Sequence, residues 1–116
     1  MRYAGDTPVY VGTGNVFEDL GLDDADELTI KGQLTFIIRG IIKRRRLTQV
    51  QAAAILGIDQ PRVSDLMRYH TDGFSLERLL HFIRALGVDV KITLKDAAEQ
   101  PREPGALGRL EVVAAG

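Results

Sequence analysis

The chain has 116 residues, which suits one domain of ordinary size and excludes a two-domain enzyme. Hydrophobic residues make up 45% of it and charged residues 27%, close to the globular average, so we expect a folded core. The absence of cysteine excludes disulfide frameworks, thiolate metal sites and cysteine nucleophiles. No apolar run is long enough to span a bilayer, and the N-terminus lacks the apolar stretch of a signal peptide, which predicts a cytoplasmic protein with no membrane contact.

The charges are unevenly distributed, although the formal net charge is only −1. Residues 1–30 carry one base and seven acids, residues 31–84 carry ten bases and four acids, and residues 85–116 carry four bases and five acids. The middle part is therefore a basic module with a net charge of +6. Such a module is typical of proteins that bind nucleic-acid phosphates, whereas a solvated charged face is the alternative that charge alone leaves open.

Capping residues and apolar spacing predict three helices before residue 70. The first covers about residues 24–45, because acids stand at its start and apolar residues recur at helical spacing: Leu34, Ile37, Ile38, Ile41 and Ile42. The second runs from a cap at Thr48 to about residue 56, and the third from a cap at Asp59 to about residue 68.

A fourth helix is predicted over about residues 75–86, after which the period of the apolar residues changes to two. This alternation predicts a β-strand with one apolar face: Val88, Val90, Ile92 and Leu94. A single strand needs a partner, which either the segment Val9–Val11 or a second copy of the chain can supply. Self-pairing across a two-fold axis also covers the exposed strand edge, so we expect a homodimer joined through these four residues.

Residues 49–68 carry the most informative pattern. Two helices that cross in a helix-turn-helix unit need a small residue at the crossing, a glycine at the turn and an apolar residue that holds the second helix. Ala53, Gly57 and Val63 supply these at the required spacing, and four more residues extend the buried set: Ala52, Leu56, Ile58 and Leu66. A generic helical hairpin does not need this register, so a helix-turn-helix is favoured.

The stretch Leu47–Arg68, followed by FSLERLL from residue 74, resembles the Xre (lambda-repressor-like) helix-turn-helix family. The segments GNVFEDLGL (14–22) and LGVDVKITL (86–94) resemble, more narrowly, its HigA-like antitoxin branch. The resemblance covers about residues 12–95, and it implies a mostly α four-helix bundle with a C-terminal strand that binds duplex DNA as a dimer. The chain departs from the usual Xre pattern in having no fifth helix after residue 86.

The elements divide the chain into three parts. We expect an irregular N-terminal arm over residues 1–22, a helix-turn-helix DNA-binding domain with its C-terminal strand over residues 23–96, and a flexible tail over residues 97–116. The tail contains enough apolar residues for a short ordered segment: Leu107, Leu110, Val112 and Val113.

Helix-turn-helix geometry places the third helix in the major groove and thereby predicts the contact residues. Its side chains that are free of packing are expected at base edges: Gln60, Arg62, Ser64 and Asp65. Residues around the second helix and after the third are expected at phosphates: Arg44, Arg45, Arg46, Thr48, Gln49 and Arg68. Two alternatives stay open, namely that Arg62 pairs with Asp59 or Asp65, and that Asp65 holds Arg62 or Arg68 rather than reading cytosine.

Catalysis is not indicated, because His70 and His81 have no evident partners and Gly12–Asn15 lacks the context of a phosphate-binding loop. The acids at residues 23–27 lack the spacing of a calcium loop, so neither a metal nor a cofactor is predicted.

Two functional hypotheses follow. The first is a sequence-specific transcriptional regulator that binds double-stranded DNA and represses its own operon as a dimer. The resemblance to the antitoxin branch implies, in addition, a RelE-like ribonuclease toxin as partner. The second hypothesis is a protein-interaction module that neutralises such a toxin with little or no role in DNA binding. In either case charge complementarity suggests that the acidic residues 14–27 contact the toxin.

Overall fold

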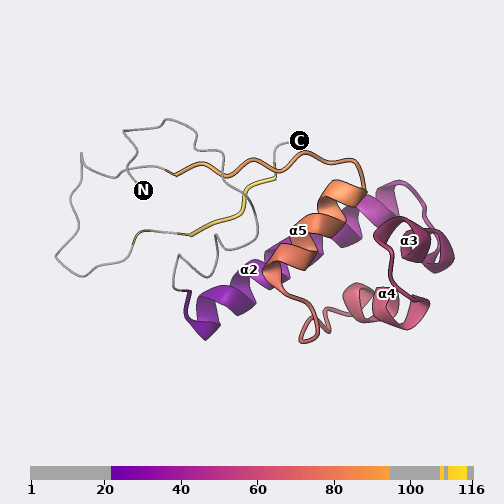
Figure 1. Cartoon of the computed structure of the whole chain (residues 1–116), viewed down its shortest axis with the longest axis horizontal. Helices are drawn as coiled ribbons and strands as arrows, with labels where there is room; N and C mark the ends of the chain where they lie inside the picture. The colour runs from indigo at the N-terminus through magenta and orange to yellow at the C-terminus, as the bar shows by residue number, and fades with distance from the viewer. Residues whose placement is uncertain (1–21, 95–107, 109, 115–116) are drawn as a thin grey trace.

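The computed structural model describes residues 22–94, 108 and 110–114. Four helices lie within these residues: α2 (Asp24–Arg44), α3 (Gln49–Leu56), α4 (Gln60–Met67) and α5 (Leu76–Ala85). Helix α5 packs along α2, and the shorter helices α3 and α4 lie together at one end of this pair (Figure 1). The mostly helical fold and its four predicted helices are confirmed, each boundary within one or two residues.

Each of the four helices begins with a side chain that accepts a hydrogen bond from the backbone three residues further on. The capping residues are Asp23, Thr48, Asp59 and Ser75. At α3 the Gln51 side chain also accepts from the Thr48 backbone N–H at 2.9 Å, which completes a capping box. These local contacts satisfy backbone donors that a helix start otherwise leaves unpaired.

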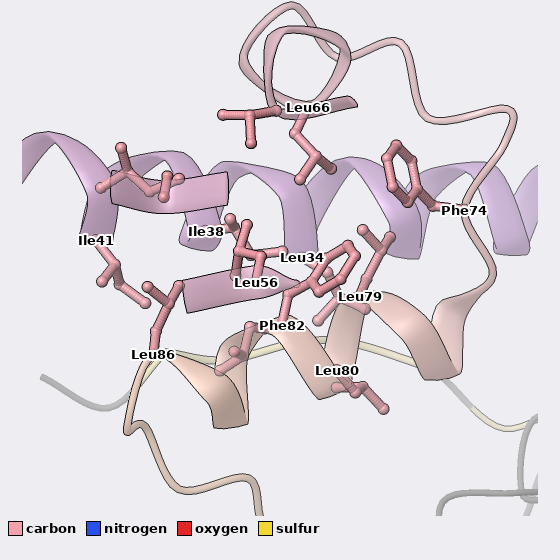
Figure 2. Packing of buried hydrophobic residues seen from close by; sticks show 14 of the residues in the cluster. Leu34, Ile38, Ile41, Leu56, Leu66, Phe74, Leu79, Leu80, Phe82 and Leu86 are labelled. Atoms are coloured by element: carbon pink, nitrogen blue, oxygen red, sulfur yellow. The ribbon is translucent and has the colours of Figure 1, made fainter. Parts of the chain in front are cut away.

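The core lies where α2, α5 and the α3–α4 pair meet (Figure 2). Leu34 and Ile38 of α2 contribute its centre, and Leu56, Leu66, Leu79 and Phe82 join them from the other three helices. Phe74, in the loop before α5, packs edge-on against Phe82 with ring centroids 5.7 Å apart. One core therefore fixes α4 to α2 and α5.

The β-strand predicted at Val88, Val90, Ile92 and Leu94 is not formed in the described part of the chain, where residues 88–94 have no regular secondary structure. The alternation itself is present, because these four residues are half-buried and the residues between them are exposed. A strand requires a hydrogen-bonded neighbour, and no described segment provides one. The alternative partner Val9–Val11 lies outside the described residues.

The predicted arm, residues 1–22, lies outside the described part except for Leu22, which is half-buried against the core. Within the predicted tail, residues 110–114 are described; they form no helix or strand, and Val112 packs against the core. None of the helices described here combines the length and the apolar character needed to cross a membrane.

Candidate nucleic-acid interface

Helices α3 and α4 form a helix-turn-helix unit whose turn is set by Gly57. This glycine has φ 72°, a left-handed conformation that side chains disfavour, and its N–H donates to the Ala53 carbonyl at 2.9 Å. Val63 and Leu66 of α4 are fully buried against the core. The small residue, the turn glycine and the locking valine predicted from the spacing thus have their expected positions.

The first turn of α4 faces solvent with Gln60 and Pro61, because burial of Val63 turns this side of the helix away from the core. Pro61 lies in the first turn, where its missing N–H costs no hydrogen bond. Ser64, one turn after Gln60, is half-buried. Gln60 and Ser64 therefore follow one another along the helix at the spacing of neighbours on a single face.

Arg62 does not point away from the protein as a base-reading side chain is expected to do. Its guanidinium carbon lies 4.5 Å from the centre of the Phe74 ring, and its Nη2 donates to the Gly73 carbonyl at 3.0 Å. The Nε atom is buried, and a Cβ at Gly73 would lie 3.4 Å from the guanidinium nitrogens. Neither Asp59 nor Asp65 forms an ion pair with it, so both sequence-based alternatives for Arg62 differ from the contact it makes.

Asp65 pairs with Arg68 across one turn, with Oδ1 and Nη2 3.4 Å apart. This is one of the two roles that the sequence left open for Asp65. The Arg68 side chain is 61% exposed, so solvent screens the pair and Arg68 can still turn to a nearby phosphate.

The three arginines before α3, Arg44–Arg46, differ in what their side chains contact. Arg45 Nη1 donates to the Leu86 carbonyl, at the end of α5, at 2.5 Å. Arg44 and Arg46 are exposed, and within the described residues no hydrogen bond or ion pair engages their side chains. Two of the three predicted phosphate-binding arginines are therefore free for a ligand, whereas the third secures α5.

Thr48 and Gln49 stand at the start of α3, both exposed. The Thr48 hydroxyl already accepts from the Gln51 N–H at 3.1 Å, whereas Gln49 is the first helical residue and its side chain makes no hydrogen bond within the described part. Backbone N–H groups at a helix start carry partial positive charge, which favours a phosphate at this position.

Sequence reasoning missed Arg39 of α2. Its Nε donates to the Met67 carbonyl at the end of α4 at 2.8 Å, its Nη1 donates to the Tyr69 hydroxyl at 2.8 Å, and its guanidinium lies 4.5 Å from the centre of the Tyr69 ring. Tyr69 itself has φ 60°. The available signal was that α4 ends without a glycine cap, so its last carbonyls need a donor from elsewhere.

Comparison with known proteins agrees with this geometry. A family model described as a helix-turn-helix domain matches residues 16–95. A solved structure that is assigned by name to the XRE family of transcriptional regulators is 44% identical, with a TM-score of 0.71, and the match covers 80% of this chain and 100% of that one. A comparison with curated proteins gave no match.

Proposed function

The chain belongs to the XRE-type helix-turn-helix family of DNA-binding transcriptional regulators, and from this premise we propose that it is a dimeric repressor that reads its own promoter through α4. The observation that carries the proposal is the exposed first turn of α4, where Gln60 precedes Ser64 on one face while Val63 and Leu66 hold the helix in the core. A helix fixed in this way presents its N-terminal side chains to the major groove.

We assign Gln60 and Ser64 to the base edges, with Gln60 suited to the N6 and N7 atoms of adenine. Asp65 remains a candidate for the amino group of cytosine. Arg62, which is held by Gly73 and Phe74, is assigned to positioning α4 rather than to reading a base.

The phosphate contacts are assigned to the two ends of the unit. Arg44, Arg46 and Gln49 approach the backbone from the start of α3, together with the cap at Thr48, and Arg68 approaches it from the end of α4. Such contacts fix the register on the duplex without carrying sequence information.

Fluorescence anisotropy tests the proposal with a duplex from upstream of the gene and a scrambled duplex of the same length, at about 50 and 200 mM salt. Gln60→Ala and Gln49→Ala form a matched pair, since each replaces an exposed glutamine at the first position of a helix. Gln60→Ala should lower the preference for the upstream duplex by about 1–3 kcal/mol, and Gln49→Ala should weaken both duplexes equally. Equal, weak binding of both duplexes by the unmodified protein would contradict the proposal and favour a purely protein-binding role.

The dimer is proposed to form through the extended segment, residues 88–94. Its half-buried residues alternate with exposed ones, and its backbone has no ladder partner in the described part of the chain; a second copy would supply both. Val90→Pro removes a backbone donor, whereas the control Val90→Ala shortens the side chain but keeps the N–H. Light scattering should give a monomer for the first and a dimer for the second; a dimer in both would exclude this interface.

A second role, as the antitoxin of a RelE-like ribonuclease in the manner of the HigA-like branch, is proposed on charge. Residues 1–30 have a net charge of −6, and the first turn of α2 exposes Asp24 and Asp26 beside a half-buried Glu27. A ribonuclease needs a basic surface for RNA, to which these acids are complementary. If the neighbouring gene encodes such a protein, deletion of residues 1–22 combined with Asp24→Lys and Asp26→Lys should abolish its co-purification with this chain; retained binding would place the contact elsewhere.

A further inference from the structure

Helix α2 has one face that points away from the core. Exposed or half-buried residues follow one another along this face at the spacing of about one helical turn: Ala25, Leu28, Gly32, Phe36, Gly40 and Lys43. Two of them are large and apolar, since Leu28 is 64% and Phe36 67% exposed. Apolar side chains that gather on one exposed face indicate a contact with another molecule.

The two glycines of this face have no evident role within the single chain. Gly32 and Gly40 lie in the interior of a helix, where glycine is less favourable than alanine. Neither has a positive φ, and among the described residues no atom lies within 4 Å of a Cβ built at either position. The missing side chains therefore leave room for atoms that come from outside the described part of the chain.

The groove beside Gly32 has the form of a site for a side chain from a second helix. Its volume is about 480 Å³, and its α2 wall includes Thr29, Gly32, Gln33 and Phe36. These four stand at positions i, i+3, i+4 and i+7, the spacing of residues that surround an inserted side chain where two helices pack. Tyr69 and Val112 also line the groove, so its volume is open with both of them in place.

This face is complementary to itself when two copies of α2 run antiparallel. If Phe36 of one copy lies opposite Gly32 of the other, Leu28 comes to the level of Gly40, because each step along one helix is matched by an equal step backward along the other. Each large side chain then meets a glycine, and Phe36 enters the space around Gly32. A parallel pair in register would instead place Phe36 against Phe36 and leave the glycines facing each other.

Charges at the two ends of the face favour the same direction. The first turn of α2 exposes Asp24 and Asp26 on either side of Ala25, and the last turn exposes Lys43. Lys43 forms no ion pair within the described residues. The antiparallel arrangement brings Lys43 of each copy to the level of Ala25 of the other and thus beside the two acids, whereas a parallel pair would bring like charges together.

We infer that this face of α2 binds a second copy of the chain, with the two α2 helices antiparallel and the Phe36 side chain of each copy in the groove of the other. A contact between single helix faces buries less than the roughly 1,600 Å² of a standard interface, so the association is weak. It is measured at about 1 mM protein, well above the concentrations used in light scattering. The inference is independent of DNA binding and of the pairing through residues 88–94.

A spin label tests the contact and its direction in the full chain with Val90→Pro, which removes the pairing through residues 88–94. The protein has no cysteine, so Ala25→Cys gives a unique attachment site. Spin-labelled protein without isotope is mixed with isotope-labelled protein without the spin label, so that only contacts between chains broaden amide signals. Gly40 and Lys43 should broaden, whereas the first turn of α2, roughly 27 Å away along the helix, should stay sharp. No broadening in α2, or broadening of its first turn instead, would overturn the proposal.

Phe36→Asp and Val50→Asp are matched variants, because the two side chains are 67% and 62% exposed but Val50 lies on α3. Phe36→Asp should lower the association constant about a hundredfold, since burial of one phenylalanine accounts for roughly tenfold and the two-fold symmetry repeats the loss. Val50→Asp should leave the constant unchanged. Sedimentation equilibrium over a range of protein concentrations measures both constants, and equal effects of the two variants would overturn the proposal.

Gly32→Gln separates the contact from the stability of the fold. Glutamine is a better helix former than glycine and has room at this position in the single chain, so the Tm should rise by about 4 °C. The same side chain occupies the space that receives Phe36, so the association constant should fall at least tenfold. A variant that is stabilised but associates as the unmodified protein does would overturn the proposal.

Discussion

Arg62 offers the sharpest test of how α4 is held, because sequence and structure assign it different tasks. As the third residue of α4 in a helix-turn-helix, it is expected to contact guanine or a phosphate. In the structure its guanidinium stacks on Phe74 and donates to the Gly73 carbonyl, so it ties the start of α4 to the loop before α5. We therefore predict that Arg62→Ala acts first on the stability of the fold.

The magnitude follows from the two contacts that are lost. A cation over an aromatic ring contributes about 0.5–1 kcal/mol when partly exposed. A hydrogen bond from a charged donor contributes about 1.5–3 kcal/mol when well buried, and the lower end applies to Arg62 because its Nη2 contact is exposed. Arg62→Ala should therefore cost about 2 kcal/mol, which lowers the Tm of a domain of this size by roughly 10 °C.

Thermal unfolding followed by circular dichroism measures this loss, with Gln60→Ala as the control. Gln60 is exposed at the start of the same helix, so its replacement should change the stability by less than about 0.5 kcal/mol. In DNA binding Gln60→Ala should have the larger effect on sequence discrimination, with a loss of about 1–3 kcal/mol at one base pair. Arg62→Ala should instead weaken all duplexes alike.

The opposite result would refute the reasoning. If Arg62→Ala leaves the Tm within about 2 °C of the unmodified protein, the contacts with Phe74 and Gly73 contribute little. If it also removes discrimination at a single G·C pair, Arg62 swings out of its contact and reads the base. Arg62→Lys separates charge from shape, because lysine keeps the cation but loses the planar fork, and it should recover less than half of the lost stability.

Three further predictions concern the contacts around α3 and the end of α4. Thr48→Ala should lower the free energy of unfolding in urea by about 1 kcal/mol through loss of the capping box, and Thr48→Ser should restore most of it. Arg44→Ala should reduce the slope of log Kd against log salt by about 0.9 without loss of stability. Arg45→Ala should leave this slope unchanged and lower the free energy of unfolding, because its guanidinium is bound at the end of α5. Equal salt slopes for the two variants would contradict the assignment of Arg44 to phosphate and Arg45 to the fold. Tyr69→Phe removes the hydroxyl that accepts from Arg39 and should cost about 0.5–1.5 kcal/mol in thermal unfolding, and an unchanged Tm would exclude a role for this contact.

The helices could be predicted from the sequence because their signals are local. Thr48 and Asp59 reach only three residues ahead, and Gly57 acts at its own backbone, so each boundary depends on residues that are adjacent in the chain. The strand could not be predicted in the same way. Alternation from Val88 to Leu94 describes a surface that can pair, but whether it pairs depends on a second segment that this pattern does not specify.

The contacts of the arginines were the least predictable part of the site, for a related reason. Arg44 and Arg45 are adjacent and chemically identical, yet only Arg45 lies within reach of the Leu86 carbonyl, 41 residues further along the chain. Arg39 likewise finds its acceptor 28 residues away, at Met67. The sequence shows how many cations the chain has, but which of them bind a backbone carbonyl depends on how the helices pack.

The contact of Arg39 also shows what could sharpen such a prediction, whereas Arg45 donates at the end of α5 although Gly87 follows there in the left-handed conformation, with φ 82°. Helix α3 ends at a glycine whose left-handed conformation turns its N–H back to a carbonyl of the last turn. Helix α4 ends at Met67 without a glycine, and there Arg39 donates to the free carbonyl. Cations in a basic helix-turn-helix protein should therefore first be matched to the free carbonyls at helix ends, and only the remainder counted toward the phosphate surface.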